Sequence, residues 1–383
     1  MFRLIRTHSS GARYGELQTV HGTLRTPFFM PIATKGAVKT LSAPELFSLE
    51  RDIDNETTPI VLSNTYHLYL KPGLALLRQA GGVAPFMHWP AGGAMLTDSG
   101  GFQIFSLSHL RTITEEGVNF RSHIDGSMHH ISPEFSMEIQ SVIGADIWMA
   151  FDYFPGYPAA PEDVEHSVQL TTRWAKRCRA WVDSYREGQG ATTQKLFGIV
   201  QGSTIAKLRE QSAKELVALD FDGYAIGGLA VGEPAEEMYR VLESTVPHIP
   251  SDRPRYLMGV GFPEQILEAV KRGVDMFDCV LPTRNARHGS LFVHRIGHES
   301  IVANDLSEVQ YERINIKSDK YSKDFNPIDR ACLCSTCTSG FSRAYIRHLF
   351  SVNEPLAARL ATIHNLTFYL QLMKEIRDTI THI

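Results

Sequence analysis

Seven short apolar segments recur along the chain, and each ends in polar residues or glycine. They span residues 59–65, 94–101, 145–152, 196–202, 223–228, 255–259 and 274–278. Segments with helical periodicity lie between most of them. A strand that is apolar throughout has apolar side chains on both faces, and both faces must therefore be packed against other elements. Parallel strands joined by helices are packed in this way. The alternation therefore predicts a (β/α)8 barrel, with an open doubly wound sheet as the alternative fold.

The helical segments carry recognisable start signals. Ser132 followed by Pro133 is typical of an N-cap and a first helical position. Further helices are expected over residues 161–185, 204–218, 234–246 and 263–272.

Polar residues follow the predicted strands at their carboxyl ends. They are Asn64, Asp98, Asp152, Gln201, Gly228 and Asp278. In a barrel these positions converge on one mouth, where active sites lie. The alternative is that polar residues simply mark the ends of strands. That alternative explains one or two of these residues, but it explains three carboxylates less well. The pattern favours the barrel and places the chemistry at its mouth.

The two ends of the chain differ from this rhythm. Residues 1–40 alternate polar and apolar positions around glycines, which predicts short antiparallel strands. After Asp278, residues 288–302 resemble a β-ribbon, residues 304–329 are polar, and helices follow from Ser342. We interpret residues 1–383 as one barrel domain, with a subdomain inserted near the C-terminus at about residues 288–383.

A cysteine cluster indicates that the C-terminal subdomain binds zinc. Cys332, Cys334 and Cys337 can converge on one tetrahedral Zn²⁺, and a later histidine can complete the shell. Both His348 and His364 are candidates by spacing. Four protein ligands leave no open position, so such a zinc ion would be structural. Three buried, inert thiols are the alternative interpretation.

Composition limits the function classes. The chain has 383 residues, 43% hydrophobic and 21% charged, and a formal net charge of −4. A nucleic-acid partner would therefore require a local basic patch rather than bulk attraction. The N-terminal residues have no apolar signal core, and no apolar run approaches the ~20 residues of a membrane helix. We expect a cytoplasmic protein with reduced cysteines.

Several motifs together point to a family. DSGGFQ at 98–103, GGLAVGE at 227–233, FDCVLPTRNAR at 277–287 and the cysteine cluster closely resemble the tRNA-guanine transglycosylases. The likeness extends over nearly the whole chain. It implies a zinc-bearing (β/α)8 barrel that exchanges guanine at wobble position 34 of GUN-anticodon tRNAs for a 7-deazaguanine, preQ1 or queuine. The partners would be the anticodon loops of tRNAs of the Asp, Asn, His and Tyr type, and we expect a homodimer.

The resemblance also implies roles for individual residues. Asp278 matches the nucleophile that binds ribose C1′, and Asp98 the general acid and base. The substrate-binding positions are Ser99, Gly100, Gly101, Phe102, Asp152, Gln201, Gly228 and Met258. The RNA-binding positions are Gly259, Val260, Gly261, Phe262, Pro263, Glu264, Gln265, Thr283, Arg284, Asn285, Ala286 and Arg287. The family motif favours His364 as the fourth metal ligand.

One departure from the family pattern concerns the incoming base. Bacterial members usually carry a cysteine where this chain has Phe154, while Val231 is of the bacterial type. A larger apolar wall could reshape the pocket, which leaves preQ1 and queuine both open.

Three other readings compete. A noncatalytic RNA-binding relative would lack the catalytic constellation, which Asp98 and Asp278 together oppose. An archaeosine-type enzyme usually has additional C-terminal domains. A zinc hydrolase would need an open metal site, which three cysteines and one histidine do not leave.

Overall fold

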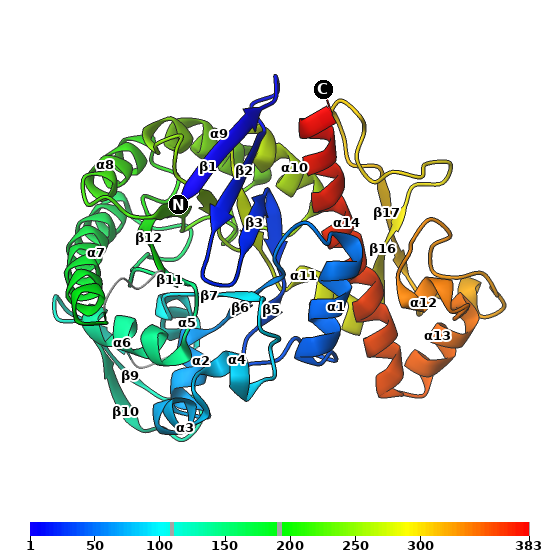
Figure 1. Ribbon diagram of the computed structural model, residues 1–383, viewed down its shortest axis with the longest axis horizontal. Coiled ribbons are helices and arrows are strands. Elements are labelled where there is room, and N and C mark those ends of the chain that lie inside the picture. Colours follow the sequence, from blue (N-terminus) through cyan, green and yellow to red (C-terminus); the bar gives the residue numbers. More distant parts are fainter. Residues whose placement is uncertain (108–110, 190–193, 383) are drawn as a thin grey trace.

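A nearly closed parallel barrel forms the body of the molecule (Figure 1), and the computed structural model describes residues 1–107, 111–189 and 194–382. The sheet begins with β4 (Phe28–Met30) and ends with β5 (Ile32–Ala33), which are halves of one strand separated by Pro31. The same strand therefore supplies both edges, and the sheet closes on itself. Between them, in sheet order, lie β15 (Met276–Asp278), β14 (Arg255–Leu257), β13 (Gly223–Ile226), β12 (Lys195–Val200), β11 (Ile147–Met149), β7 (Ala94–Thr97) and β6 (Ile60–Ser63).

The barrel prediction is confirmed, with one correction. All seven predicted strands form, and neighbouring strands pair in parallel. The eighth strand, residues 28–33, lies inside the 1–40 segment for which antiparallel strands were expected. Pro31 divides it into pieces too short to show a strand pattern.

Helices cover the outside of the barrel, as Figure 1 shows for α6, α7 and α8. The predicted N-cap is present, because Ser132 Oγ accepts from the Phe135 N–H at 3.1 Å. The helices of the barrel portion are α1 (Ala43–Ile53), α2 (Thr65–Leu70), α3 (Leu74–Ala80), α4 (Val83–Phe86), α5 (Gly101–Leu107), α6 (Pro133–Ile143), α7 (Pro161–Gln189), α8 (Ala206–Val217), α9 (Ala235–Thr245), the 3₁₀ turn η1 (Val246–His248) and α10 (Pro263–Lys271).

An antiparallel sheet closes the N-terminal end of the barrel. It consists of β1 (Phe2–Thr7), β2 (Arg13–Gln18) and β3 (Thr23–Thr26). Phe2, Leu17 and Leu24 join the apolar cluster that fills the barrel interior. A buried ion pair of 3.0 Å joins Arg13 to Asp275, the residue just before β15. Since this end is closed, a site in the barrel must open at the opposite mouth.

A second antiparallel sheet was not predicted. It is formed by β8 (Arg111–Ile113), β9 (Val118–Arg121) and β10 (Met128–Ile131), and it lies between α5 and α6 in the chain. Its strands are short and rich in polar residues, so their pattern resembles that of a loop.

The C-terminal part forms a smaller unit with its own apolar core. It contains α11 (Leu281–Arg287), β16 (Ser290–His294), β17 (Tyr311–Asn315), the 3₁₀ turn η2 (Asp319–Tyr321), α12 (Ser335–Thr338) and α13 (Arg343–Ser351). The predicted ribbon is present, but its second strand, β17, lies in the 304–329 segment that was read as merely polar.

Helix α14 (Pro355–His382) joins the two units. It packs on α1, α11 and β4 on one side and on α12 and α13 on the other. Figure 1 shows it running between the barrel and the α12–α13 region. The chain thus leaves the barrel after β15 and returns in α14, which takes the place of the last outer helix. None of the described helices is long and apolar enough to cross a membrane.

Candidate functional site

A cleft of about 450 Å³ opens at the carboxyl ends of the barrel strands. Five of the six predicted strand-end residues line it: Asn64, Asp98, Asp152, Gly228 and Asp278. The prediction that these positions converge on one mouth is therefore confirmed for them. Gln201 lies behind the cleft wall.

Asp278 ends β15 and is held on one carboxylate oxygen. The hydroxyl of Tyr256 donates to Oδ1 at 2.5 Å, and the Gly259 N–H donates to the same atom at 2.9 Å. Burial raises the pKa of Asp278 above its usual value, although both hydrogen bonds oppose the shift. Because both donors hold Oδ1, Oδ2 is left to act on a ligand in the cleft.

Asp98 follows β7 and faces the same cleft. Its carboxylate accepts hydrogen bonds from the Asn64 side-chain amide and, at 2.8 Å, from the Thr65 N–H. Burial raises the pKa of Asp98 to about 7, and the negative charge of Asp278 adds to the shift. A carboxyl group that titrates near neutral pH can both donate and accept a proton during a reaction.

Asp152 follows β11 and is supported from behind. Ser99 Oγ donates to Oδ1 at 2.6 Å, and Gln201 Nε2 donates to Oδ2 at 2.8 Å. Burial raises the pKa of Asp152 to about 6, against these two hydrogen bonds. The backbone at position 101 lies so close to Asp152 that only glycine fits there, because an added Cβ would lie 2.6 Å from the Asp152 carbonyl oxygen.

Gln201 is almost completely buried and does not line the cleft. Its side-chain amide packs against the backbone of Gly227 and Gly228, where an added Cβ would approach within 2.7 and 2.6 Å. Gly228 itself lines the cleft, and its φ of +63° favours glycine. Gln201 thus orients Asp152, and its expected direct contact with a base stays a prediction.

Aromatic and apolar side chains form the walls of the cleft. Phe102 is 51% exposed and stacks on Phe154, with ring centroids 6.0 Å apart and an interplanar angle of 6°. Met258 and Val231 also line the cleft. Ser99 is largely buried and also lines the cleft, and Gly100 adopts a φ of +84° before α5 begins. A planar ligand fits between such walls.

Tyr256 and His67 line the cleft, although neither was assigned a role from sequence. Tyr256 contacts Asp278, yet an aromatic residue inside an apolar strand has the pattern of a core residue. His67 lines the cleft, and burial lowers its pKa to about 4, so it is neutral near pH 7. Its place on the face of α2 gave no sequence signal.

The predicted RNA-binding segments border the cleft on one side. Arg284 and Glu264 are exposed, and Phe262, Gln265, Asn285 and Arg287 are half-buried. The side chains of Val260, Pro263, Thr283 and Ala286 are buried, as is Gly261. The Tyr311 hydroxyl donates to Glu264 at 2.7 Å, which ties this rim to the C-terminal unit. Only the exposed and half-buried members can present side chains to a partner.

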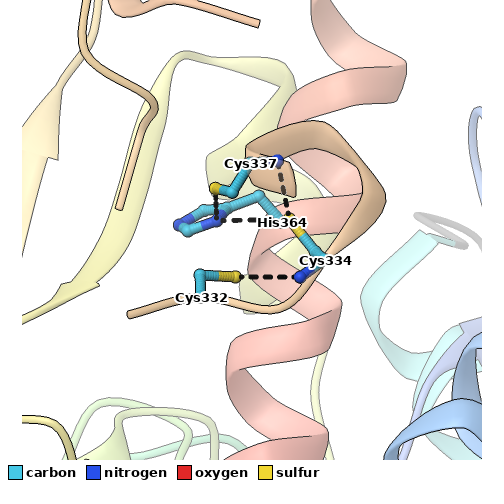
Figure 2. A group of neighbouring side chains, drawn as sticks. All are labelled: Cys332, Cys334, Cys337 and His364. Atoms are coloured by element: carbon cyan, nitrogen blue, oxygen red, sulfur yellow. Dashed lines mark hydrogen bonds between the residues drawn. The ribbon is translucent and has the colours of Figure 1, made fainter. Parts of the chain in front are cut away.

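The cysteine cluster forms a compact four-donor group (Figure 2). One ligand atom from each of Cys332, Cys334, Cys337 and His364 lies within 4.8 Å of the others, and all four residues are buried. His364 Nδ1 lies 3.5 Å from the Cys337 sulfur and 3.8 Å from the Cys334 sulfur. The exposed His348 is not part of the group, so the structure selects His364.

The histidine tautomer suits a metal. His364 Nε2 lies 2.6 Å from the Phe292 carbonyl oxygen, and a carbonyl can only accept. Nε2 must therefore carry the hydrogen, which leaves the Nδ1 lone pair directed at the sulfurs. Three thiolates and one imidazole nitrogen can hold a metal ion and are compatible with a structural zinc.

Fold and site together define a class of protein. A (β/α)8 barrel with buried carboxylates at its mouth and a closed Cys₃His cluster beside the barrel describes a barrel enzyme with a cluster that can hold a metal ion. Comparison with known proteins gives the family. Residues 8–382 match the family model described as queuine tRNA-ribosyltransferase, and the chain belongs to that family of transferases.

Curated relatives agree with this assignment. The queuine tRNA-ribosyltransferase of Pelotomaculum thermopropionicum is 52% identical over 375 residues, which cover 98% of this chain and 92% of the relative. That of Moorella thermoacetica is 48% identical over 98% of this chain and 92% of the relative. That of Bacillus velezensis is 50% identical over 97% and 89%. The resemblance seen in the motifs is confirmed.

Proposed function

We propose that this protein replaces guanine at wobble position 34 of GUN-anticodon tRNAs with preQ1 or queuine, in queuosine modification. Family membership supports the modification of tRNA guanine. The observation that carries the finer proposal is the arrangement of Asp98 and Asp278 in one cleft. Burial raises the pKa of both carboxyl groups, and the negative charge of Asp278 raises that of Asp98 further. Paired carboxylates in this relation suit substitution at an anomeric carbon.

The reaction proceeds in two displacements. Asp278 attacks ribose C1′, the bond from C1′ to guanine N9 breaks, and protonated Asp98 supplies the proton that the departing base takes up. The incoming base then loses its N9 proton to Asp98, and N9 attacks C1′ while the Asp278–ribose ester breaks. Asp98 ends protonated and Asp278 ionised, as at the start.

Base recognition falls to Asp152 and to the backbone near Gly228. Asp152 accepts from the guanine N1–H and exocyclic amine, while Gln201 and Ser99 hold its carboxylate in place. The backbone N–H groups near Gly228 donate to the base's carbonyl edge. Phe102 and Met258 cover the two faces of a base that has been flipped out of its stack.

The tRNA contacts are proposed for the rim. Arg284 and Arg287 lie three residues apart on α11, so they occupy one side of the helix and can reach phosphates of the anticodon loop. Asn285 and residues 259–265 complete this border. The cluster of Cys332, Cys334, Cys337 and His364 holds one Zn²⁺, which stabilises the C-terminal unit and takes no part in the exchange.

We propose a cytoplasmic homodimer as the working form. Sedimentation velocity across a range of protein concentrations would measure the oligomeric state; a monomer throughout would contradict it.

One assay tests the proposed function directly. Substrate tRNA that carries labelled guanine at position 34 is incubated with the enzyme and with unlabelled guanine, preQ1 or queuine. Release of label with each base, and none from a tRNA with another base at position 34, is the expected result. No release with any base would contradict the proposal.

Asp98→Asn should slow exchange by about 10²–10⁴-fold, the usual contribution of general acid–base catalysis. Asparagine keeps the size of the side chain but carries no exchangeable acid proton. In the wild type, activity should rise with pH as Asp278 ionises and fall as Asp98 loses its proton near pH 7. The measurement is kcat/KM against pH for both proteins. A loss of less than about tenfold would mean that Asp98 mainly positions the base.

Phe154→Cys should change the preference between incoming bases. The stacked Phe102–Phe154 pair is a flat apolar wall that favours the larger queuine substituent, while Val231 narrows the same cleft. A few carbon atoms in such a pocket are worth ~1–3 kcal/mol, so the ratio of kcat/KM for queuine and preQ1 should shift by about tenfold or more. An unchanged ratio in the variant would show that Phe154 does not select the base.

A further inference from the structure

Arg209, near the start of α8, is a completely buried arginine. Its side chain has no exposed surface, and burial lowers its pKa to about 9. No carboxylate within the described residues forms an ion pair with it. A buried charge normally requires a partner, because its desolvation is costly. The guanidinium must therefore be stabilised in another way.

Backbone carbonyl groups supply that stabilisation. Nη1 donates to the Val200 oxygen at 2.9 Å and to the Gly227 oxygen at 2.7 Å. Nε donates to the Ser203 oxygen at 2.7 Å, and Nη2 lies 3.5 Å from the Gly228 oxygen. The fork of one side chain on α8 thus connects the end of β12 to the end of β13. These two strand ends carry Gln201 and Gly228.

The direction of the carbonyl groups fixes the direction of the N–H groups. In a trans peptide the C=O and N–H bonds point to opposite sides. Because the Gly227 carbonyl faces Arg209, the N–H of Gly228 faces away from it. The same holds for the Gly228 carbonyl and the N–H of Leu229. Both residues line the cleft, and neither N–H donates to another described residue.

The segments after β12 and β13, which Arg209 joins, contain closely packed backbone with positive φ angles. Gly228 has a φ of +63°, and a Cβ at Gly202 would lie 2.7 Å from the backbone nitrogen of Arg209. Ser203 adopts a φ of +48°, which is uncommon for a residue other than glycine. Such conformations persist only where surrounding contacts hold them.

We propose that Arg209 is a positioning residue, which holds the peptides Gly227–Gly228 and Gly228–Leu229 so that the N–H groups of Gly228 and Leu229 face the cleft as donors to the carbonyl edge of the bound base. The inference rests on the proposed function, since it assigns these donors to a guanine-type base. Arg209 lies outside the cleft and acts through the backbone.

Arg209→Lys is the test variant, because an ammonium keeps the charge but cannot span the Val200, Ser203 and Gly227 oxygens together. The matched control is Arg255→Lys at the opposite end of the barrel. Arg255 is also buried, and it also donates to carbonyls, those of Ile249 at 2.8 Å and Gly273 at 3.3 Å. Both variants lose comparable bonds to carbonyl groups, but only Arg209 is bonded to the backbone of residues that line the cleft.

The readout is selectivity for the 6-oxo group. KM for guanine and Ki for 6-thioguanine, whose sulfur is a weak hydrogen-bond acceptor, are measured in tRNA exchange. Arg209→Lys should raise KM for guanine by about tenfold and Ki for 6-thioguanine by less than about threefold, since a misdirected donor penalises mainly the base that uses it. Arg255→Lys should lower the melting temperature while leaving the ratio of the two constants unchanged.

Three results would overturn the proposal. One is that the ratio of KM for guanine to Ki for 6-thioguanine is the same in Arg209→Lys as in the wild type. Another is an equal change of ratio in Arg255→Lys. The third is that Arg209→Lys and Arg209→Gln both fail to fold while Arg255→Lys folds, which would make Arg209 a folding residue instead. The measurement on the wild-type enzyme tests a different claim. If the wild type does not exchange guanine, the proposed function itself is refuted.

Discussion

Asp278→Ala should abolish base exchange while the fold stays intact. The variant removes the carboxylate that we propose as the nucleophile, and no other carboxylate of the cleft accepts from Tyr256 and Gly259 in that position. Loss of a nucleophile typically costs far more than loss of a hydrogen bond, so we expect a rate reduction of at least about 10³-fold. The measurement is single-turnover release of labelled guanine from substrate tRNA.

A covalent adduct distinguishes this role from a structural one. Wild-type enzyme incubated with tRNA and a competing base should yield a protein–RNA species that survives denaturation. Asp278→Asn is the isosteric control, since its side-chain oxygen can still accept from Tyr256 and it should melt near the wild-type temperature. An adduct formed by Asp278→Ala would show that the nucleophile has been assigned to the wrong residue.

Cys334→Ala should lower metal content and thermal stability together. The Cys334 sulfur lies near His364 Nδ1, and the Cys337 N–H donates to it at 3.4 Å. Metal binding is worth about 10–16 kcal/mol in isolated zinc-finger peptides, and part of that stabilisation should apply to the C-terminal unit here. Metal analysis and thermal melting of the same samples measure both effects.

Two other variants serve as controls for the metal prediction. Cys178→Ala removes a buried thiol outside the cluster, so it should keep the metal while it leaves a small cavity and removes the hydrogen bond from the Phe151 N–H. His348→Ala should also retain the metal, because that side chain is exposed. A zinc-free Cys334→Ala protein with wild-type melting and full activity would refute a structural zinc.

The barrel could be predicted because its signal is local and repeated. Each inner strand is a short apolar run with cover on both faces, and the polar residues at 64, 98, 152 and 278 mark where the strands end. Parallel geometry then brings those ends together without further information. The metal ligands were accessible for a similar reason, although spacing alone left His348 and His364 open, and the fold placed His364 beside the thiols.

What sequence reasoning missed depends on long-range contacts. The strand at residues 28–33 becomes recognisable only when β15 and β6 pair with its two halves. Tyr256 has the pattern of a core residue until Asp278, 22 positions later, lies against its hydroxyl. Arg209 gave no signal, because a charged residue in the first turn of a helix is ordinarily solvated. The hydrogen bond from Gln201 to Asp152 also joins distant residues, so only the three-dimensional packing shows it, while the contact expected between Gln201 and the base stays a prediction.

The place of α14 in the barrel affects how the chain can fold during synthesis. Arg377 on this helix donates to the Pro27 carbonyl at 2.6 Å, a contact between residues 350 positions apart. At about 5–20 residues per second, a ribosome needs roughly 20–70 s to make the intervening chain. Until α14 emerges, the outer face of β4 and the apolar side of α1 have no cover. The nascent protein should therefore depend on chaperones that shield apolar surface, and completion of the barrel should follow translation of residues 355–382.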